Sequence, residues 1–247
     1  MKKIHVVIMV MALIGAGIAG AFILLQPAWD ERKPEGPVND KSVNEITVNG
    51  KVKLPAPKYD SGTSVEKALL NRRSVREYKD EPMTLTEVSQ ILWAAQGISD
   101  ARTGFRTAPS AGALYPLEVY VIIVNVEGAA KGVYKYAPHE HELVKVRDGN
   151  VGDEMAAAAV GQTWVGEGGI IIVFCAVYER TTQKYGDRGI RYVHMEVGHA
   201  AQNVYLQAVS LNLGTAVVGA FEDEKVRKIL NMSDEEDPLY IVPVGKI

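Results

Sequence analysis

The sequence predicts an α+β fold, in which strands and helices are mixed without a strict strand–helix–strand alternation. Residues 170–177 are apolar at every position, as is typical of a central strand buried on both faces. Two shorter strand candidates, residues 132–137 and 142–146, are separated only by a turn and indicate a hairpin. Helical patterns lie both before and after these strands, and this mixture points to α+β.

Two helices are predicted before the first strand. Ser64 can cap a short helix over residues 65–71, because its hydroxyl can accept a hydrogen bond from a free backbone N–H group. Thr84 or Thr86 begins a second helix, which ends at Gly97. One face of that second helix is apolar, at Leu85, Val88, Ile91, Leu92 and Ala95.

The remaining elements follow at short spacing. Residues 118–126 form a β-branched run that predicts a strand ahead of the hairpin. Residues 190–213 contain no proline and are closed by Gly214, so they have the length of a main core helix. A strand, a helix and a strand are then expected at residues 215–220, 222–230 and 239–244.

The first 60 residues differ from the rest. Lys2 and Lys3 precede residues 4–25, which carry no acidic or basic residue apart from His5. A helix of that length covers about 33 Å, enough to cross a bilayer core of about 30 Å. We therefore expect residues 1–25 to be an uncleaved transmembrane anchor, with a cleaved signal peptide as the alternative.

The paired lysines favour an N-terminus in the cytoplasm, with everything after Leu25 outside it, although Arg32 and Lys33 follow the span closely. Residues 26–60 are rich in proline and charge and are expected to be a linker. Residues 61–247 are expected to form the globular domain.

Composition excludes several classes of function. The chain has 27 basic and 30 acidic residues and no basic stripe interleaved with aromatic residues, so nucleic-acid binding is not expected. Its single cysteine, Cys175, excludes a disulfide framework and a cysteine-rich metal site, and is expected to be buried. His194 and His199 are five residues apart on the long helix, whereas zinc-binding helices space two histidines four apart, so no metal is expected.

Three segments could carry chemistry. Residues 72–76 place three guanidiniums and a hydroxyl together, which suits a phosphorylated ligand or, alternatively, a solvated basic turn. The small residues of 107–116 allow a backbone to approach a flat ligand, but a plain loop fits equally well. In the polar stretch 178–192, Lys184 and Tyr185 could transfer protons or could be ordinary surface residues.

Taken in order, four segments resemble the nitroreductase-like flavoproteins, and among them the SagB/ThcOx-type dehydrogenases that oxidise azolines. The resemblance covers about residues 62–247 and is carried by residues 72–76, 110–118, 179–192 and 198–203. It implies a mainly antiparallel sheet flanked by helices, and an FMN-dependent oxidoreductase that is usually a homodimer with the flavin at the subunit interface.

The resemblance also assigns roles to residues. In such proteins the FMN phosphate and ribityl chain are held at the positions of Arg72, Arg73, Ser74 and Arg76. The isoalloxazine is lined from the partner subunit by a loop that corresponds to Pro109, Ser110, Ala111 and Gly112. Its N5/O4 edge is approached by the turn at Gly219 and Ala220.

Two further expectations come from the resemblance. A Lys–Tyr pair that removes the substrate proton maps onto Lys184 and Tyr185, and hydride would pass between flavin N5 and a small organic or peptide substrate. Many relatives carry a C-terminal extension whose basic residues hold the flavin phosphate. In this chain Lys246 would take that role. The alternatives are an NAD(P)H-dependent nitro or quinone reductase, and a membrane-bound flavin-fold subunit that has lost catalysis.

Overall fold

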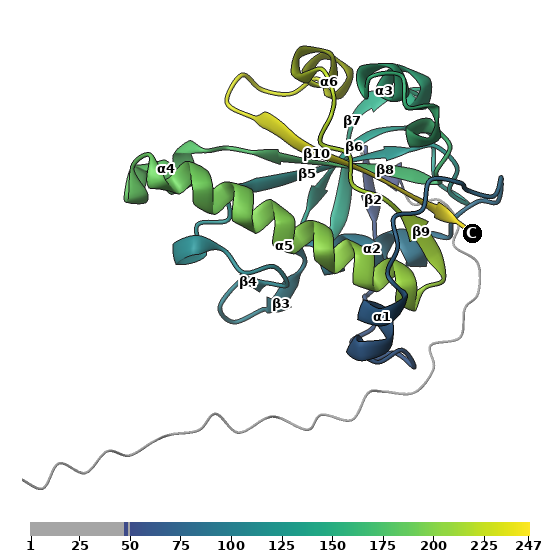
Figure 1. Cartoon of the computed structure of the whole chain (residues 1–247), viewed down its shortest axis with the longest axis horizontal. Helices are drawn as coiled ribbons and strands as arrows, with labels where there is room; N and C mark the ends of the chain where they lie inside the picture. The colour runs from purple at the N-terminus through teal and green to yellow at the C-terminus, as the bar shows by residue number, and fades with distance from the viewer. Residues whose placement is uncertain (1–46, 49) are drawn as a thin grey trace, which may run out of the picture. The chain divides into compact units, whose positions relative to one another are not determined.

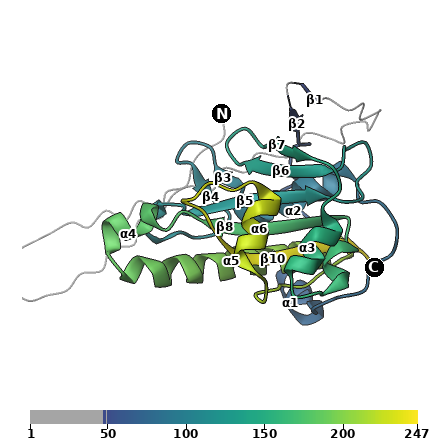
Figure 2. The same ribbon diagram turned by 90° about the horizontal axis from the view of Figure 1, so that it is seen from above.

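The computed structural model describes residues 47–48 and 50–247, and its core is an eight-stranded sheet. The strand order is β1-β2-β7-β6-β5-β8-β10-β9, and every neighbouring pair is antiparallel. Figure 2 shows the strands from β1 to β10 in this order. The strands are β1 (Thr47–Val48), β2 (Lys51–Lys53), β5 (Leu117–Ile123), β6 (Gly132–Ala137), β7 (Glu142–Asp148), β8 (Ile170–Ala176), β9 (Leu213–Thr215) and β10 (Asp237–Lys246). The predicted hairpin is β6–β7, and the α+β class is confirmed.

The buried run predicted as a central strand is β8, which lies between β5 and β10. Successive side chains of a strand point to opposite faces. Ile170, Ile172 and Phe174 accordingly join one hydrophobic core, and Ile171 and Val173 join a second core on the other face. Both faces of the sheet are therefore covered, which explains why no polar residue interrupts the strand.

Helices cover the two faces of the sheet (Figure 1). The helices α2 (Leu85–Gln96) and α5 (Arg188–Ser210) pack on one face, and α3 (Gly152–Ala158) and α6 (Asp223–Leu230) pack on the other. The short α1 (Val65–Asn71) and α4 (Glu179–Tyr185) both contact α5. The remaining elements are β3 (Ile98–Asp100), β4 (Phe105–Arg106) and the 3-10 turns η1 (Ala111–Ala113) and η2 (Thr163–Gly166).

Of the two predicted starts of the second helix, Thr84 and Thr86, the structure shows Thr84 as the capping residue. Its side chain accepts from the backbone N–H of Glu87, and the Glu87 carboxylate accepts in return from the backbone N–H of Thr84. This capping box satisfies two of the N–H groups that a helix start leaves free. At the other end, Gly97 closes the helix as predicted.

The sheet begins earlier than the boundary expected at residue 61. Strands β1 and β2 lie inside the segment predicted to be a linker, and Val52 of β2 pairs with Leu143 of β7. The strand expected at residues 215–220 is shorter, because only Thr215 belongs to β9 and Val218 makes an isolated bridge to Ile241.

The prediction of a membrane-anchored, extracytoplasmic enzyme with a transmembrane helix is contradicted. Within the described part of the chain no helix is both long and apolar enough to span a bilayer. The longest of these helices, α5, carries charged residues such as Arg188, Arg191 and Glu196 and buries only one face. The segment predicted to form the span, residues 4–25, lies outside the described residues.

Candidate functional site

The arginine segment, residues 72–76, follows α1 and is fixed beside β9. The Val75 backbone N–H donates to the Thr215 carbonyl at 2.9 Å. A Cβ added to Gly214 would lie only 2.8 Å from Val75 Cγ1, so a larger residue at that strand position would push the segment away. The sequence therefore holds this segment in place through backbone pairing and one close glycine contact.

The three guanidiniums of the segment lie over aromatic rings or against backbone. Arg72 lies over the Tyr205 ring at 5.0 Å, and Arg76 over the Trp164 ring at 5.5 Å. Arg73 donates to the carbonyls of Leu70 and Arg72. Within residues 50–247, none of the three pairs with a carboxylate. This uncompensated positive charge, beside the hydroxyl of Ser74, fits a phosphate group.

Tyr205 on α5 connects this segment to the chain that follows β9. Its hydroxyl lies 3.0 Å from Ser74 Oγ and accepts from the Val217 backbone N–H at 3.0 Å. The exposed Gly219 and Ala220 follow directly. Sequence reasoning missed Tyr205, and no local signal marks it, because its partners come from distant parts of the chain.

The loop before β5 contacts the predicted proton-transfer pair. A Cβ built on Gly112 would lie 2.8 Å from Tyr185 Oη and 3.1 Å from Lys184 Nζ, so only a glycine backbone fits there without moving the pair. Gly112 also has φ 64°, which a glycine adopts without strain. Lys184 is exposed, and its Nζ lies 5.5 Å from the centre of the half-buried Tyr185 ring. In the same loop, Pro109 is exposed and Ser110 and Ala111 are half-buried.

Arg180 ties α4, and with it the Lys184–Tyr185 pair, to this loop. One of its guanidinium nitrogens donates to the Tyr115 carbonyl at 3.1 Å, and another pairs with the Glu118 carboxylate. Glu118 also pairs with Lys135 at 3.2 Å on the neighbouring strand β6. Because Arg180 lies one helical turn before Lys184, these contacts set the position of the pair.

A buried carboxyl lies beside the same loop. Glu196 on α5 is 2% exposed, and burial raises its pKa to about 7, although Ser110, Arg106 and Gln96 act in the opposite direction. Burial likewise lowers the pKa of Arg106. The carboxyl therefore changes its protonation state near neutral pH.

Lys246 lies at the end of β10 and is neutralised by a neighbour. Its Nζ donates to Glu87 Oε1 at 2.6 Å, and both side chains are mostly buried.

Cys175 is buried within β8, as predicted, and burial raises the pKa of its thiol.

The structure brings the predicted residues together in two groups that do not meet in one chain. Figure 1 shows α1 and α4 at opposite ends of α5. The arginine segment contacts α5 at Tyr205, and the Lys184–Tyr185 pair precedes its first residue, Arg188. At 1.5 Å rise per residue, the two groups are about 25 Å apart along the helix.

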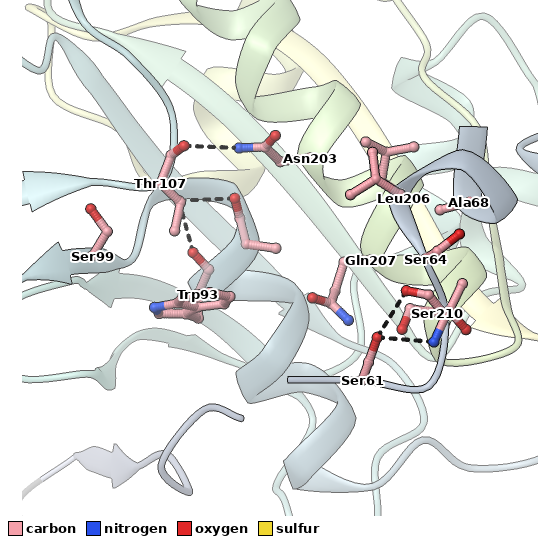
Figure 3. Close-up of a pocket in the computed structure, with 13 residues that line it drawn as sticks. Ser61, Ser64, Ala68, Trp93, Ser99, Thr107, Asn203, Leu206, Gln207 and Ser210 are labelled. Atoms are coloured by element: carbon pink, nitrogen blue, oxygen red, sulfur yellow. Dashed lines mark hydrogen bonds between the residues drawn. The ribbon is translucent and has the colours of Figure 1, made fainter. Parts of the chain in front are cut away.

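A cavity of about 390 Å³ lies between α1, α2 and α5. Its lining carries no charged side chain and contains none of the residues predicted to bind flavin or to transfer protons. Asn203 donates to the Thr107 carbonyl in its lining (Figure 3), and the Ser61 hydroxyl bonds locally to the backbone of Thr63. The cavity therefore belongs to neither group of site residues.

The antiparallel sheet is covered by helices on both faces, and the site adds an arginine segment without carboxylate partners and a Lys–Tyr pair. Together these features define the class to which this protein belongs. The nitroreductase family model matches residues 69–246, and the chain belongs to the nitroreductase family of oxidoreductases.

Three similarities support this assignment. A Methanocaldococcus jannaschii protein, named provisionally as a nitroreductase, is 55% identical over 182 residues, which cover 74% of this chain and 90% of that protein. The microcin B17-processing protein of Escherichia coli is 30% identical over 171 residues, covering 67% of this chain and 63% of that protein. A Ralstonia eutropha structure, also named as a nitroreductase, has a TM-score of 0.69 and 27% identity, covering 86% and 98% of the two chains.

Proposed function

We propose that this chain is an FMN-dependent oxidoreductase that transfers hydride between the flavin and a small organic or peptide substrate of the azoline type, as in SagB/ThcOx-type dehydrogenases. The observation that carries the proposal is the close approach of Gly112 to the Lys184–Tyr185 pair, where an added Cβ would lie 2.8 Å from the Tyr185 hydroxyl oxygen. A loop able to lie against a flat ring system thereby meets groups able to move a proton. The 30% identity to the microcin B17-processing protein supports the peptide substrate class.

The residues present fit FMN. Its phosphate would be held by the guanidiniums of Arg72, Arg73 and Arg76 and by the hydroxyl of Ser74, since those guanidiniums have no carboxylate partner among the described residues. Gly219 and Ala220 would present backbone to the ring edge, as the resemblance implies. When bound, the flavin supplies the two-electron acceptor that no side chain of this chain offers.

The Lys184–Tyr185 pair would take the substrate proton. The Tyr185 hydroxyl lies toward the loop at Gly112, and the Lys184 ammonium lies beside the tyrosine ring. Arg180 keeps both in place through Tyr115 and Glu118. We assign proton removal to this pair, in which the accepting atom would be Tyr185 Oη as a phenolate or Lys184 Nζ as a free amine.

A homodimer accounts for the separation of the two groups. About 25 Å lies between the arginine segment and the Lys–Tyr pair along α5, too far for one flavin to reach both in a single chain. A two-fold axis across α5 would bring the arginine segment of one copy to the Gly112 loop of the other. Apolar side chains stand exposed on α1 and α5 for such a contact, at Val65, Leu69, Leu70, Ile190 and Met195.

Mixed dimers test this arrangement. Arg72→Ala and Lys184→Met chains would each be inactive alone, but in a mixture about a quarter of the sites would combine two intact halves. Recovered turnover of that order supports a shared site. A mixture that stays as inactive as its parents shows that both groups act within one chain.

An NAD(P)H-dependent nitro or quinone reductase is the second candidate, favoured by the name of the 55% identical relative. The two are separated by assaying the full chain with added FMN for oxidation of an azoline-containing model peptide and for NADH-driven reduction of a nitroarene. Azoline oxidation that Lys184→Met and Tyr185→Phe abolish supports the first proposal, with Lys228→Met on the exposed face of α6 as the matched control. NADH-driven turnover that neither Lys184→Met nor Tyr185→Phe changes supports the reductase.

A further inference from the structure

Tyr205 on α5 contacts two of the four residues proposed to hold the FMN phosphate. Its hydroxyl oxygen lies 3.0 Å from Ser74 Oγ, and the Arg72 guanidinium lies over its ring at 5.0 Å from the centre. The hydroxyl and the ring of one side chain therefore act on two different groups of the arginine segment.

The hydrogen bonds of Tyr205 have a defined direction. The Val217 backbone N–H lies 3.0 Å from the Tyr205 hydroxyl oxygen, and this N–H can only donate. The phenol oxygen is thus already an acceptor, and its own proton is left for Ser74 Oγ, its other hydrogen-bond partner in the described part of the chain. A phenol is also the better donor of the two hydroxyls, because it is more acidic than a serine. The hydrogen bond between the side chains therefore runs from Tyr205 to Ser74.

This direction leaves the proton of the Ser74 hydroxyl free. Ser74 is exposed, and its hydroxyl bonds to no other group among residues 50–247. A hydroxyl whose oxygen already accepts a hydrogen bond can donate its own proton to an anionic oxygen. Hydrogen bonds to a charged acceptor are roughly twice as strong as those between neutral groups. Tyr205 thus prepares Ser74 as a donor to a phosphate.

The ring of Tyr205 acts on Arg72 without occupying its hydrogen-bonding groups. A guanidinium over an aromatic face is attracted by the electrons of the ring, and this contact uses none of its N–H donors. Arg72 is half-buried and pairs with no carboxylate among the described residues. Its planar set of donors therefore stays available for bidentate binding of a phosphate.

We propose that Tyr205 is a positioning residue for the phosphate end of FMN, which orients the Ser74 hydroxyl as a donor and holds the Arg72 guanidinium beside it. The inference rests on the proposed function, because the phosphate is that of the proposed cofactor. Tyr205 acts through these two residues, since its hydroxyl is already engaged by Ser74 and Val217.

FMN and riboflavin differ only in the phosphate, so the ratio of their dissociation constants measures how strongly the chain prefers the phosphate. Tyr205→Phe keeps a ring under Arg72 but removes the donor to Ser74, and is expected to lower this preference about tenfold. Tyr205→Leu also removes the ring and is expected to lower the preference further. A general loosening of the site weakens the binding of both flavins and cancels in the ratio.

Ser74→Ala shows whether Tyr205 acts through the serine. If it does, the double variant Ser74→Ala/Tyr205→Phe has the same preference for FMN as Ser74→Ala alone. Tyr134→Phe is the matched control, because the Tyr134 hydroxyl also bonds to a backbone group, the Ala130 carbonyl at 2.8 Å, and the Lys145 ammonium also lies over its ring. This control is expected to keep the native preference.

A preference for FMN that Tyr205→Phe leaves unchanged, or losses that add up in the double variant, overturn the proposal. A native chain that binds neither FMN nor riboflavin refutes the proposed function, and amide hydrogen exchange then decides on the positioning role. The probe is the Val75 amide, which donates to the Thr215 carbonyl and follows Ser74 directly. Exchange at least tenfold faster in Tyr205→Phe than in Tyr134→Phe supports positioning of the segment, and equal exchange in the two variants overturns it.

Discussion

Substitution of Glu196 by glutamine is expected to change how stability depends on pH. Burial holds the pKa of Glu196 near 7, above the ordinary value of 4.5 that applies in the unfolded chain. Between these two values the folded protein keeps the proton and the unfolded chain releases it, so the native stability falls as pH rises. At about 1.4 kcal/mol per pKa unit, the loss reaches about 3 kcal/mol by pH 7 and stays constant above it.

Glutamine carries no titrating proton, so Glu196→Gln escapes this loss. Urea unfolding of both proteins from pH 4.5 to 8 gives the difference in free energy of unfolding, in which the contributions of all other groups cancel. The variant is expected to gain about 3 kcal/mol relative to the native protein across that range, the gain being complete above pH 7. A difference that does not vary with pH would refute the reasoning.

Three further substitutions test the site. Gly112→Ala is expected to cost about 1–2 kcal/mol of stability through its left-handed φ, and to lower turnover more than tenfold by displacing the Tyr185 hydroxyl; urea unfolding and steady-state kinetics measure the two effects. Tyr205→Phe leaves the Val217 N–H without its acceptor and is expected to cost about 1–3 kcal/mol in urea unfolding. Arg72→Ala is expected to weaken FMN binding by tenfold or more, measured by flavin fluorescence, with native unfolding behaviour.

Elements with strong local signals could be predicted from the sequence. The helix at residues 65–71 has the predicted bounds, because a capping serine precedes it. The buried strand β8 was recognisable because it is apolar on both faces. Helix α4 was missed, since only Thr181 of its seven residues is buried and no apolar periodicity marks it.

Tertiary pairing decided the elements that local signals could not reveal. Strand β2 is three residues long, and only its pairing with β1 and β7 makes it a strand. In the site, clustered arginines and a Lys–Tyr pair were visible as sequence motifs. Tyr205 was not, because it meets Ser74 across 131 residues of sequence. The burial of Glu196 was not visible in the sequence either, because it depends on how α5 packs.

The flavin content of the purified chain tests the central claim most directly. Our account predicts a yellow protein that releases FMN on denaturation, with one FMN per chain after reconstitution and a lower content in the Arg72→Ala variant. A colourless protein that takes up no added FMN would contradict the account, and would indicate a flavin-fold subunit without catalysis.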